Sequence, residues 1–453
     1  MFLKIEDNIL FKRGIMAYEI ILGREKKEKE LHGNEGTILL GKHYVKMGDE
    51  TTLAQNVFLD VNKAHVVFVA GKRGSGKSYS LGVIAEGIKY LPKELNKRLS
   101  VILLDTMGVY WTMKYPNNKD ISLLDEWGLK PGKVDVTIYT PEGYYEEYKK
   151  KKIPTDAPFS IIPSELNPED WWNAFELVMN DRLAVYIERV VLSLKMIKKI
   201  YGIKDIVEFI AHDQKEEKHI RQSAMNRFNS AAQWGLFSEK GTPIKDLVKE
   251  GEITILDLSP YAIMPNGWKI KCLAMGFVCN KLFIERMKVR KDEEYQSIQS
   301  GIHFVGGKKV KSSMPNIWIM IDEAHEFLPK TGSTGASSSL ITLLREGRQP
   351  GIALVLATQQ PGKIHTDAMT QSDVILAHRL TAKIDTDALG ELMQSYLRKN
   401  LDLQLQYLPG VPGACLAIDD VNEKIFPMRV RPKFSWHGGG APDLLSQEKG
   451  LLG

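Results

Sequence analysis

The sequence contains little cysteine. Only Cys272, Cys279 and Cys415 occur among its 453 residues. Two of them share one stretch with helical spacing, and three thiols in this arrangement form neither a disulfide framework nor a zinc site. We therefore expect three small, buried apolar side chains in a protein that works in a reducing compartment.

Long apolar runs and a strong excess of charge are also missing. No stretch of about 18 apolar residues could span a bilayer, and the amino-terminal MFLKIEDNILFKRG is charged throughout, unlike a signal peptide. These features predict a cytoplasmic protein. Its 61 basic and 56 acidic residues leave a net charge of +5. Such mild basicity is compatible with binding to nucleic acid without being an argument for it.

What the sequence has instead is a set of short apolar runs, each bounded by turn residues or by segments with helical spacing. The runs are VVFVA (66–70), VILLD (101–105), VTIY (136–139), ITILDL (253–258), IWIMID (317–322), IALVLAT (352–358) and VILAH (374–378). Runs without polar alternation are typical of strands that are buried on both faces, as in a mainly parallel sheet covered by helices. The predicted fold class is therefore α/β.

The rest of the chain predicts further parts. Residues 1–60 contain short alternating segments and predict a small β domain, with REKKEKELHGNEG (24–36) as a solvated hairpin or loop. The α/β domain extends over 61–437, and within it 168–236 show helical periodicity that predicts a helical insertion. The glycine-rich residues 438–453 predict a flexible tail.

Two features of these parts have alternative explanations. Trp171 and Trp172 either pack the helical insertion onto the core or stack on nucleic-acid bases, and core packing is favoured because the neighbouring AFELVM continues a helix face. Residues 286–316 are polar and locally basic. They form either a solvated loop, which is favoured, or a surface excursion that contacts an acidic partner.

The most specific motif is GKRGSGKS (71–78), which fits the phosphate-loop pattern of a glycine, four residues and Gly-Lys-Ser. Its glycines let the backbone turn tightly and point successive N–H groups at phosphate oxygens. Lys77 is expected to reach the β- and γ-phosphates, and the Ser78 hydroxyl to bind Mg²⁺. The loop follows a buried strand and opens a helix, whose positive end adds to the attraction. The residues expected to bind a nucleoside triphosphate are Gly71, Gly74, Ser75, Gly76, Lys77, Ser78 and Tyr79.

A carboxylate near Mg²⁺ and a base for the attacking water are also needed for hydrolysis. IWIMIDEAHEFLP (317–329) supplies a candidate for each: Asp322 ends an apolar strand, and Glu323 follows it. The alternative is that Asp322 only caps a short helix. His325 is expected to be a local hydrogen-bond partner, since no second His or Cys stands at metal spacing. No metal beyond Mg²⁺ is predicted.

Downstream, LLREGRQPGIALVLATQQP (343–361) contributes amides and guanidinium groups. Its strand ends in Gln359 and Gln360, where an amide can sense the γ-phosphate or hold the water. Arg345 and Arg348 precede the strand at the end of a helix. An exposed arginine is usually a solvated charge, but in ring ATPases it is often donated to the γ-phosphate of the neighbouring subunit.

These motifs, in this order, resemble the HerA/FtsK superfamily of ring-forming ATPases, and HerA-type proteins most closely. The segments that carry the resemblance are GKRGSGKS, VILLDTMGVY (101–110), EGEITILDLS (250–259), IDEAHEFLP, the REGR…TQQP stretch and RVRPKFSWH (429–437). They cover roughly residues 35–437. The sequence departs from the family pattern at Arg73, where many relatives have Thr, and at Val109, where an acidic residue is common.

The resemblance implies a RecA-like ATPase domain behind a small, barrel-like amino-terminal β domain, assembled as a hexamer whose channel takes duplex DNA. It also implies ATP and Mg²⁺ as cofactors and a separate partner, a NurA-type nuclease or another effector. By motif, Ser78 and Asp322 would hold Mg²⁺, Glu323 would be the catalytic base and Gln359 would read the γ-phosphate. Arg348 would be the arginine finger that acts on the neighbouring subunit, with Arg345 as its substitute.

Three functions are open at this point. The first is a motor that translocates DNA, and the second is a nucleotide-dependent ring scaffold that organises a separate effector, for example in phage defence. The third, a secretion or conjugation motor, is weaker because the sequence shows no membrane anchor. Nothing in the sequence resembles a nuclease centre, so any cutting of DNA would fall to a partner.

Overall fold

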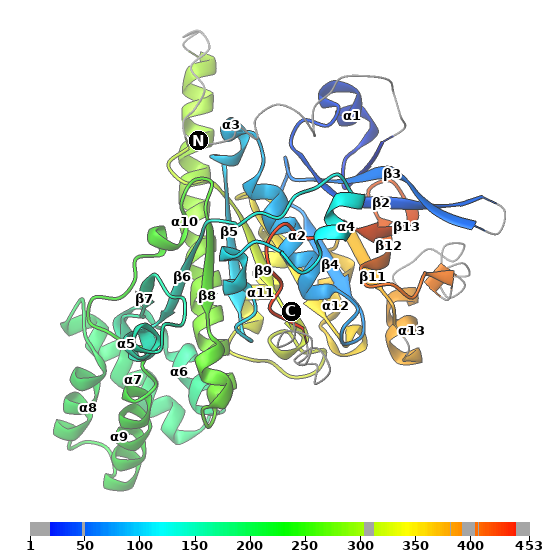
Figure 1. The fold of residues 1–453 in the computed structure, drawn as a ribbon. Coiled ribbons are helices and arrows are strands. Elements are labelled where there is room, and N and C mark those ends of the chain that lie inside the picture. The colour runs from blue at the N-terminus through cyan, green and yellow to red at the C-terminus, as the bar shows by residue number, and fades with distance from the viewer. Residues whose placement is uncertain are drawn as a thin grey trace.

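The structure is a computed structural model that describes residues 19–47, 50–302, 312–380, 382–391, 404–405 and 407–440. Within these residues one continuous sheet of thirteen strands crosses the molecule in the order β1-β3-β2-β13-β12-β11-β4-β10-β9-β5-β8-β6-β7 (Figure 1). The strands are β1 (Ile20–Leu22), β2 (Thr37–Met47), β3 (Glu50–Asp60), β4 (Val66–Ala70), β5 (Leu99–Asp105), β6 (Val136–Pro141), β7 (Ala157–Phe159), β8 (Ile253–Asp257), β9 (Asn316–Ile321), β10 (Ile352–Thr358), β11 (Val374–His378), β12 (Ala414–Asp419) and β13 (Lys424–Val430).

The central part of the sheet is parallel, as predicted. All seven apolar runs are strands, namely β4, β5, β6, β8, β9, β10 and β11, and each pairs in parallel with neighbours from the same set. The α/β fold class is confirmed. Two antiparallel strands, β12 and β13, follow β11 and were not predicted.

Helices cover both faces of this sheet. Along β4 the side chains alternate, so that Val66 and Phe68 contribute to one apolar core and Val67 and Val69 to the other. Helix α2 packs in the second core, whereas α6–α11 contribute to the first. The helices are α1 (Lys26–His32), α2 (Lys77–Lys89), α3 (Lys93–Asn96), α4 (Ile121–Glu126), α5 (Glu142–Lys150), α6 (Pro168–Phe175), α7 (Arg182–Ile197), α8 (Ile203–His212), α9 (Lys218–Ala232), α10 (Gly267–Ile302), α11 (Ser337–Glu346), α12 (Thr366–Thr370) and α13 (Lys383–Glu391).

The amino-terminal strands extend the main sheet. β2 pairs antiparallel with β3 and, on its other side, with β13, so hydrogen bonds link residues 37–60 to the central strands. The division into domains at residue 60 stays a prediction. The prediction of a solvated hairpin or loop at 24–36 is wrong in its conformation, because Lys26–His32 form helix α1. Lys, Glu and Leu are good helix formers, and Gly33 ends the helix at a φ of 53°.

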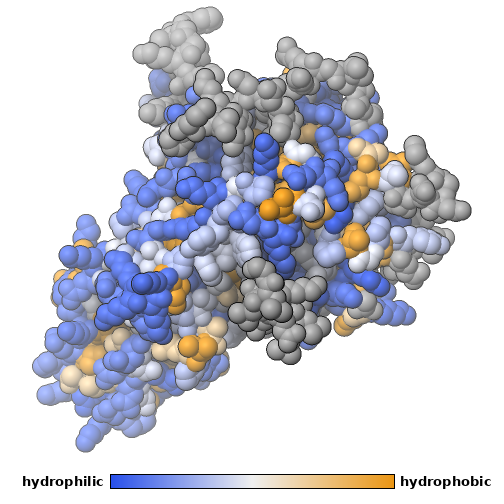
Figure 2. Space-filling model, in the orientation of Figure 1, coloured by the Kyte–Doolittle hydropathy of each residue, from blue (hydrophilic) through white to orange (hydrophobic). Residues whose placement is uncertain are grey.

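Residues 168–232 form the four helices α6 to α9, which project from one side of the molecule (Figure 1). Trp171 is fully buried and stacks on Phe175 at 5.6 Å, while the Trp172 indole donates a hydrogen bond to the Ala184 carbonyl at 2.9 Å. Core packing is therefore confirmed for Trp171. Some apolar side chains of this region stay exposed, and Figure 2 shows orange patches among its blue surface.

The prediction of a solvated loop at 286–316 is wrong over its first part, because α10 continues to Ile302. Residues 303–311 lie outside the described residues. Charged side chains pair along the exposed part of this helix, Lys288 with Glu285 at 2.7 Å and Arg290 with Glu294 at 3.2 Å. Pairs three or four residues apart stabilise a solvated helix, so the polar composition that favoured a loop belongs to an exposed helical surface.

Other expectations concern the cysteines, membrane helices and the tail. All three cysteines are buried and free, as expected. Among the described helices, none combines the length and apolar composition needed to cross a bilayer. The predicted tail falls mostly on residues 441–453, which lie outside the described part of the chain.

Candidate nucleotide-binding site

The predicted phosphate loop joins β4 to α2 at the carboxyl edge of the sheet. Gly76 has a φ of 111°, which only glycine adopts easily, and it immediately precedes the first residue of α2. A side chain at Gly71 would lie 2.4 Å from Ser75 Oγ and 2.6 Å from His378 Cβ, so that position also requires glycine. The residues Gly71, Gly74, Ser75, Gly76, Lys77, Ser78 and Tyr79 thus form one continuous turn into the helix. Its backbone N–H groups and the helix end make it suited to bind phosphate.

Lys77, Ser78 and Asp322 come together beside this loop. The Lys77 ammonium donates to the Lys72 carbonyl at 3.2 Å, and its pKa is lowered by burial although Glu323 and Asp322 oppose the shift. Burial raises the pKa of Asp322, a hydrogen bond from the Ser78 side chain opposes this shift, and Glu323 adds to it. A buried carboxylate with a raised pKa lacks sufficient positive charge nearby.

Glu323 and Gln359 meet at the ends of β9 and β10. The Gln359 side-chain amide donates a hydrogen bond to Glu323 Oε1, whereas Glu323 Oε2 is buried without a hydrogen-bond partner among the described residues. Glu323 has a φ of 51°, an uncommon backbone conformation for a non-glycine residue, which costs about 1 kcal/mol or more. His325 Nδ1 lies 3.1 Å from the Thr358 hydroxyl. Asp322 does not cap a helix; the short helix that follows begins at Ala324.

Tyr110 is a residue of this site that the sequence did not suggest. Its hydroxyl donates to Asp322 Oδ2 at 3.4 Å, and its ring is fully buried. Asp105, at the end of β5, accepts hydrogen bonds from the backbone N–H groups of Gly108 and Tyr110, both at 2.8 Å. Burial and the neighbouring Asp257 raise the pKa of Asp105 to about 7. Asp105 therefore fixes the turn that presents Tyr110 to Asp322, a role that follows only from the adjacency of β5 and β9.

His378 also lies beside the phosphate loop and was not predicted. It ends β11, the strand next to β4, and is completely buried. Burial lowers its pKa to about 4, so the imidazole is neutral at physiological pH. Nδ1 lies 3.2 Å from the Ala414 carbonyl and therefore carries the proton, which leaves Nε2 to accept from the Ser80 hydroxyl at 3.0 Å. His378 thus stabilises the first turn of α2 through its hydrogen bond with Ser80.

Tyr79 faces the carboxy-terminal segment. The backbone N–H of Lys433 donates to its hydroxyl at 2.6 Å, and the His437 ring meets its ring edge to face at 5.2 Å. The same segment is anchored on α2 by Glu86, which is fully buried and accepts from Arg431 at 3.1 Å. The predicted contact of Tyr79 with nucleotide stays a prediction.

Arg345 and Arg348 lie at the opposite edge of the sheet. Both precede β10, whereas the phosphate loop follows β4, and the two strands run parallel. Arg345 donates to Asp367 at 2.6 Å, and Arg348 pairs with Asp373 at 2.9 Å. Asp373 accepts from the N–H of Val66, which begins β4. The four residue steps from Val66 to Ala70 span about 13 Å, so Arg348 does not reach the loop of its own subunit.

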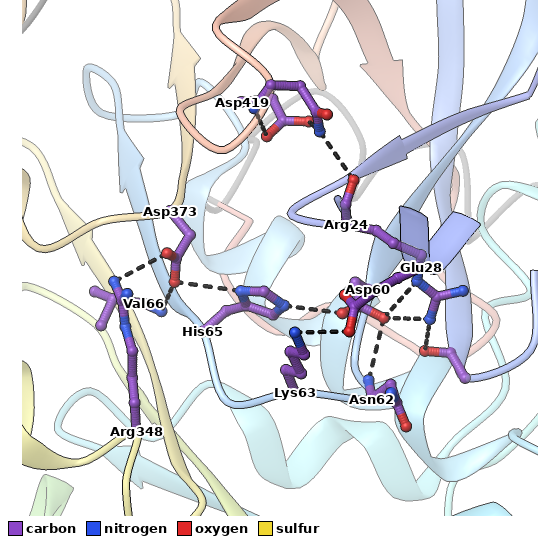
Figure 3. A network of polar contacts seen from close by, with 12 residues as sticks. Arg24, Glu28, Asp60, Asn62, Lys63, His65, Val66, Arg348, Asp373 and Asp419 are labelled. Carbon is purple, nitrogen blue, oxygen red and sulfur yellow. Dashed lines mark hydrogen bonds and ion pairs between the residues drawn. The ribbon is translucent and has the colours of Figure 1, made fainter. Parts of the chain in front are cut away.

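A buried histidine lies at this amino-terminal edge, between two carboxylates (Figure 3). His65 Nε2 is 3.1 Å from Asp60 Oδ2, and Nδ1 is 3.2 Å from Asp373 Oδ2. Burial alone would lower the pKa of His65, but the two carboxylates outweigh it and raise the pKa to about 9. His65 is therefore a buried cation at neutral pH.

The folded protein is expected to lose stability at alkaline pH because of His65. Its folded-state pKa lies above the ordinary 6.5, so the stabilisation is complete below that pH and is lost as the pH rises through 9. The free energy of unfolding, measured with a chemical denaturant, should fall by up to about 3 kcal/mol over this range. His65→Gln should lack this decline, and an equal decline in the variant would contradict the assignment.

The carboxyl-edge residues fit a triphosphate with a magnesium ion. Ser75 Oγ and Glu323 Oε2 are buried atoms without a hydrogen-bond partner among the described residues, and such atoms are costly unless a ligand satisfies them. Asp322 is almost fully buried beside the Ser78 and Tyr110 hydroxyls. Carboxylate and hydroxyl oxygens are the donors that Mg²⁺ prefers.

A phosphate loop after a central strand, with paired carboxylates two strands away in a parallel sheet, defines a P-loop nucleoside triphosphatase with a RecA-like core. The chain belongs to the HerA family: the family model for the central domain of helicase HerA matches residues 40–266, half of the chain.

Two curated relatives and one solved structure are similar to parts of the chain. The DNA double-strand break repair helicase HerA of Pyrococcus furiosus is 27% identical over 150 residues, 31% of this chain and 26% of that protein. The probable DNA double-strand break repair helicase HerA of Methanocaldococcus jannaschii is 29% identical over 143 residues, 28% and 27% of the two chains. The alignments thus span about a quarter of each relative. VirB4 of Thermoanaerobacter pseudethanolicus shares the fold, with a TM-score of 0.50 and 11% identity over 87% of this chain and 96% of that one.

Proposed function

We propose that this chain is an ATP-hydrolysing DNA translocase of the HerA type, which works as a hexameric ring on duplex DNA with a separate nuclease or effector as its partner. The observation that supports this most directly is the separation of two charged sites across the sheet. Lys77, Asp322 and Glu323 lie at one edge, and Arg348 lies at the other. An arginine that cannot reach its own nucleotide can complete the site of a neighbouring subunit in a ring.

The residues divide the chemistry between them. The loop N–H groups and Lys77 hold the phosphates, and Ser78 and Asp322 hold Mg²⁺, which neutralises phosphate charge when bound. Glu323 orients the attacking water and accepts its proton through Oε2, which has no hydrogen-bond partner among the described residues and lies 3.6 Å from His325 Nδ1. The Gln359 amide donates a hydrogen bond to the other oxygen of Glu323, Oε1. When ATP is bound, this amide can donate to the γ-phosphate instead. Because Gln359 directly follows β10, such an exchange would couple the nucleotide state to the end of that strand.

Duplex DNA is expected to raise the rate of ATP hydrolysis several-fold, because a motor couples turnover to movement along its substrate. ATP-driven displacement of streptavidin from biotinylated duplex ends measures the movement itself. Lys77→Ala, which removes the phosphate-binding ammonium, is the control for displacement without turnover. DNA binding should weaken steeply with added salt if phosphates are contacted in the channel.

The same assay separates the motor from a ring scaffold. An assembled ring that hydrolyses ATP but shows neither stimulation by DNA nor displacement would contradict the translocase. It would favour the alternative, a nucleotide-dependent scaffold for an effector protein.

A further inference from the structure

The Arg348 side chain makes its contacts through one nitrogen atom of its guanidinium group. Its Nη2 atom lies 2.9 Å from Asp373 Oδ1 and donates to the Gln371 carbonyl at 2.7 Å. Both of these contacts, within the described part of the chain, use Nη2. The N–H groups of Nε and Nη1 therefore stay available for a phosphate, and the side chain is 48% exposed.

The second oxygen of Asp373 is fixed as well. It accepts hydrogen bonds from the Val66 backbone N–H at 3.0 Å and from His65 Nδ1 at 3.2 Å. The other nitrogen of His65 lies 3.1 Å from Asp60, whose remaining oxygen is bound by the buried guanidinium of Arg24 (Figure 3). Because every side chain of this row except that of Arg348 is buried or nearly so, Asp373 is held in one orientation.

Charges alternate along this row. The cations Arg348, His65 and Arg24 are separated by the carboxylates of Asp373 and Asp60. If Asp373 faced Arg348 alone, the pair would be neutral and would attract a phosphate weakly. The protonated His65 shares the charge of Asp373, so the guanidinium keeps more of its attraction for an anion.

The backbone that carries Arg348 is fixed from the other side by Arg286 of α10. This guanidinium is 1% exposed and donates to the Pro350 carbonyl and to the Met314 carbonyl, both at 2.7 Å. It also lies 3.1 Å from the Asn316 side chain at the start of β9. Arg286 therefore ties the turn between α11 and β10 to the neighbouring strand.

We propose that His65, Asp373 and Arg286 are positioning residues for the arginine finger: they hold Arg348 in the orientation in which it contacts the γ-phosphate of a neighbouring subunit. This inference rests on the proposed function, since it assumes that Arg348 acts across a subunit interface. It further implies that Asp60 and Arg24 connect the finger to the amino-terminal strands. Arg24 donates to the Gly33 and Glu35 carbonyls, at the end of α1, at 2.7 and 2.8 Å.

Double-variant kinetics test the proposal in the full-length chain. Arg348→Ala should lower kcat for ATP by about 100-fold or more. Asp373→Asn and His65→Gln, which keep hydrogen-bonding groups in place, should lower kcat between about 5- and 50-fold, with KM and nucleotide affinity within twofold of wild type. When either substitution is combined with Arg348→Ala, kcat should fall no further than in Arg348→Ala alone, because the guanidinium group that these residues position is already absent.

Asn422→Ala is the matched control for lost stability. It removes hydrogen bonds to the Arg24 carbonyl and to Asp419, at the far end of the same row, without touching Asp373. We expect its kcat to stay within twofold of wild type at a comparable loss of unfolding free energy.

The pH dependence gives a test that needs no substitution in the row. The charged groups that surround His65 are Asp60, Asp373, Arg24, Arg348 and Asp419. As His65 loses its proton at alkaline pH, kcat of the wild type should fall, and the residual activity of Arg348→Ala should not show this decline. A decline of equal size in both proteins would overturn the proposal.

The outcomes separate the two levels of inference. If Arg348→Ala hydrolyses ATP like wild type, the finger itself is wrong, and the proposed function loses its main support. If Arg348→Ala is impaired but Asp373→Asn and His65→Gln keep normal kcat, or add fully to Arg348→Ala, only the positioning role is wrong.

Discussion

Glu323→Gln is expected to lower ATP turnover by about 10²- to 10⁴-fold while ATP binding stays intact. Glutamine has nearly the same shape, so the contact with Gln359 can persist, but an amide cannot accept a proton from the attacking water. The phosphate-binding loop and Asp322 are untouched by the change. Phosphate release measures the loss of turnover, and equilibrium binding of a fluorescent ATP analogue measures the affinity.

Glu326→Gln is the matched control for this substitution. Glu326 is an exposed carboxylate three residues further along the same turn, and it has no contact with Gln359 among the described residues. Its variant should hydrolyse ATP at the wild-type rate. Hydrolysis by Glu323→Gln at that same rate would remove Glu323 from the role of catalytic base.

Mixing two inactive variants is expected to restore part of the activity. Arg348→Ala subunits keep Glu323 and the other candidate residues at the carboxyl edge of the sheet. Glu323→Gln subunits keep Arg348 at the opposite edge. Because Arg348 lies beyond the reach of its own nucleotide, an interface between the two variants can combine an intact finger with an intact base. Each variant alone should be at least about 100-fold impaired. Phosphate release by the mixture, measured over a range of ratios, should clearly exceed the sum of the separate rates.

Arg345→Ala distinguishes between the two candidate fingers. Both arginines flank the same turn and both are about half exposed, Arg345 at 59% and Arg348 at 48%. We expect Arg345→Ala to stay within a few-fold of wild type, because a surface ion pair such as that with Asp367 contributes little. A larger loss for Arg345→Ala than for Arg348→Ala would reverse the assignment.

The sequence alone predicted the features that depend on consecutive residues. A buried strand in a parallel sheet is a continuous apolar run, so β4, β5, β6, β8, β9, β10 and β11 could be read from composition and turn residues. The phosphate loop is equally local, because its geometry depends on glycines at fixed spacing. Asp322 and Glu323 followed from their position directly after an apolar strand.

Predictions failed where polar composition had more than one structural solution. Residues 26–32 and 286–302 carry mainly charged or polar side chains, which are compatible with a loop and with a solvated helix. In residues 286–302 the helix is stabilised by ion pairs between neighbouring turns and by the hydrogen bond of Arg286 to the Pro350 carbonyl. β12 and β13 were missed. They pair with each other as an antiparallel hairpin, and β13 is only partly buried and contains Pro427, so it lacks the continuous apolar run that marks the parallel strands.

What the sequence determined by itself is therefore the core of parallel strands and the phosphate-loop motif with its candidate carboxylates, since both are encoded in short segments. Only the tertiary structure decided which distant side chains meet. Strand order brings Tyr110 to Asp322, His378 beneath α2, and His65 between Asp60 and Asp373. The physical reason is that a buried polar group is stabilised by whichever partner the fold places within hydrogen-bond distance, and the sequence does not specify that partner locally.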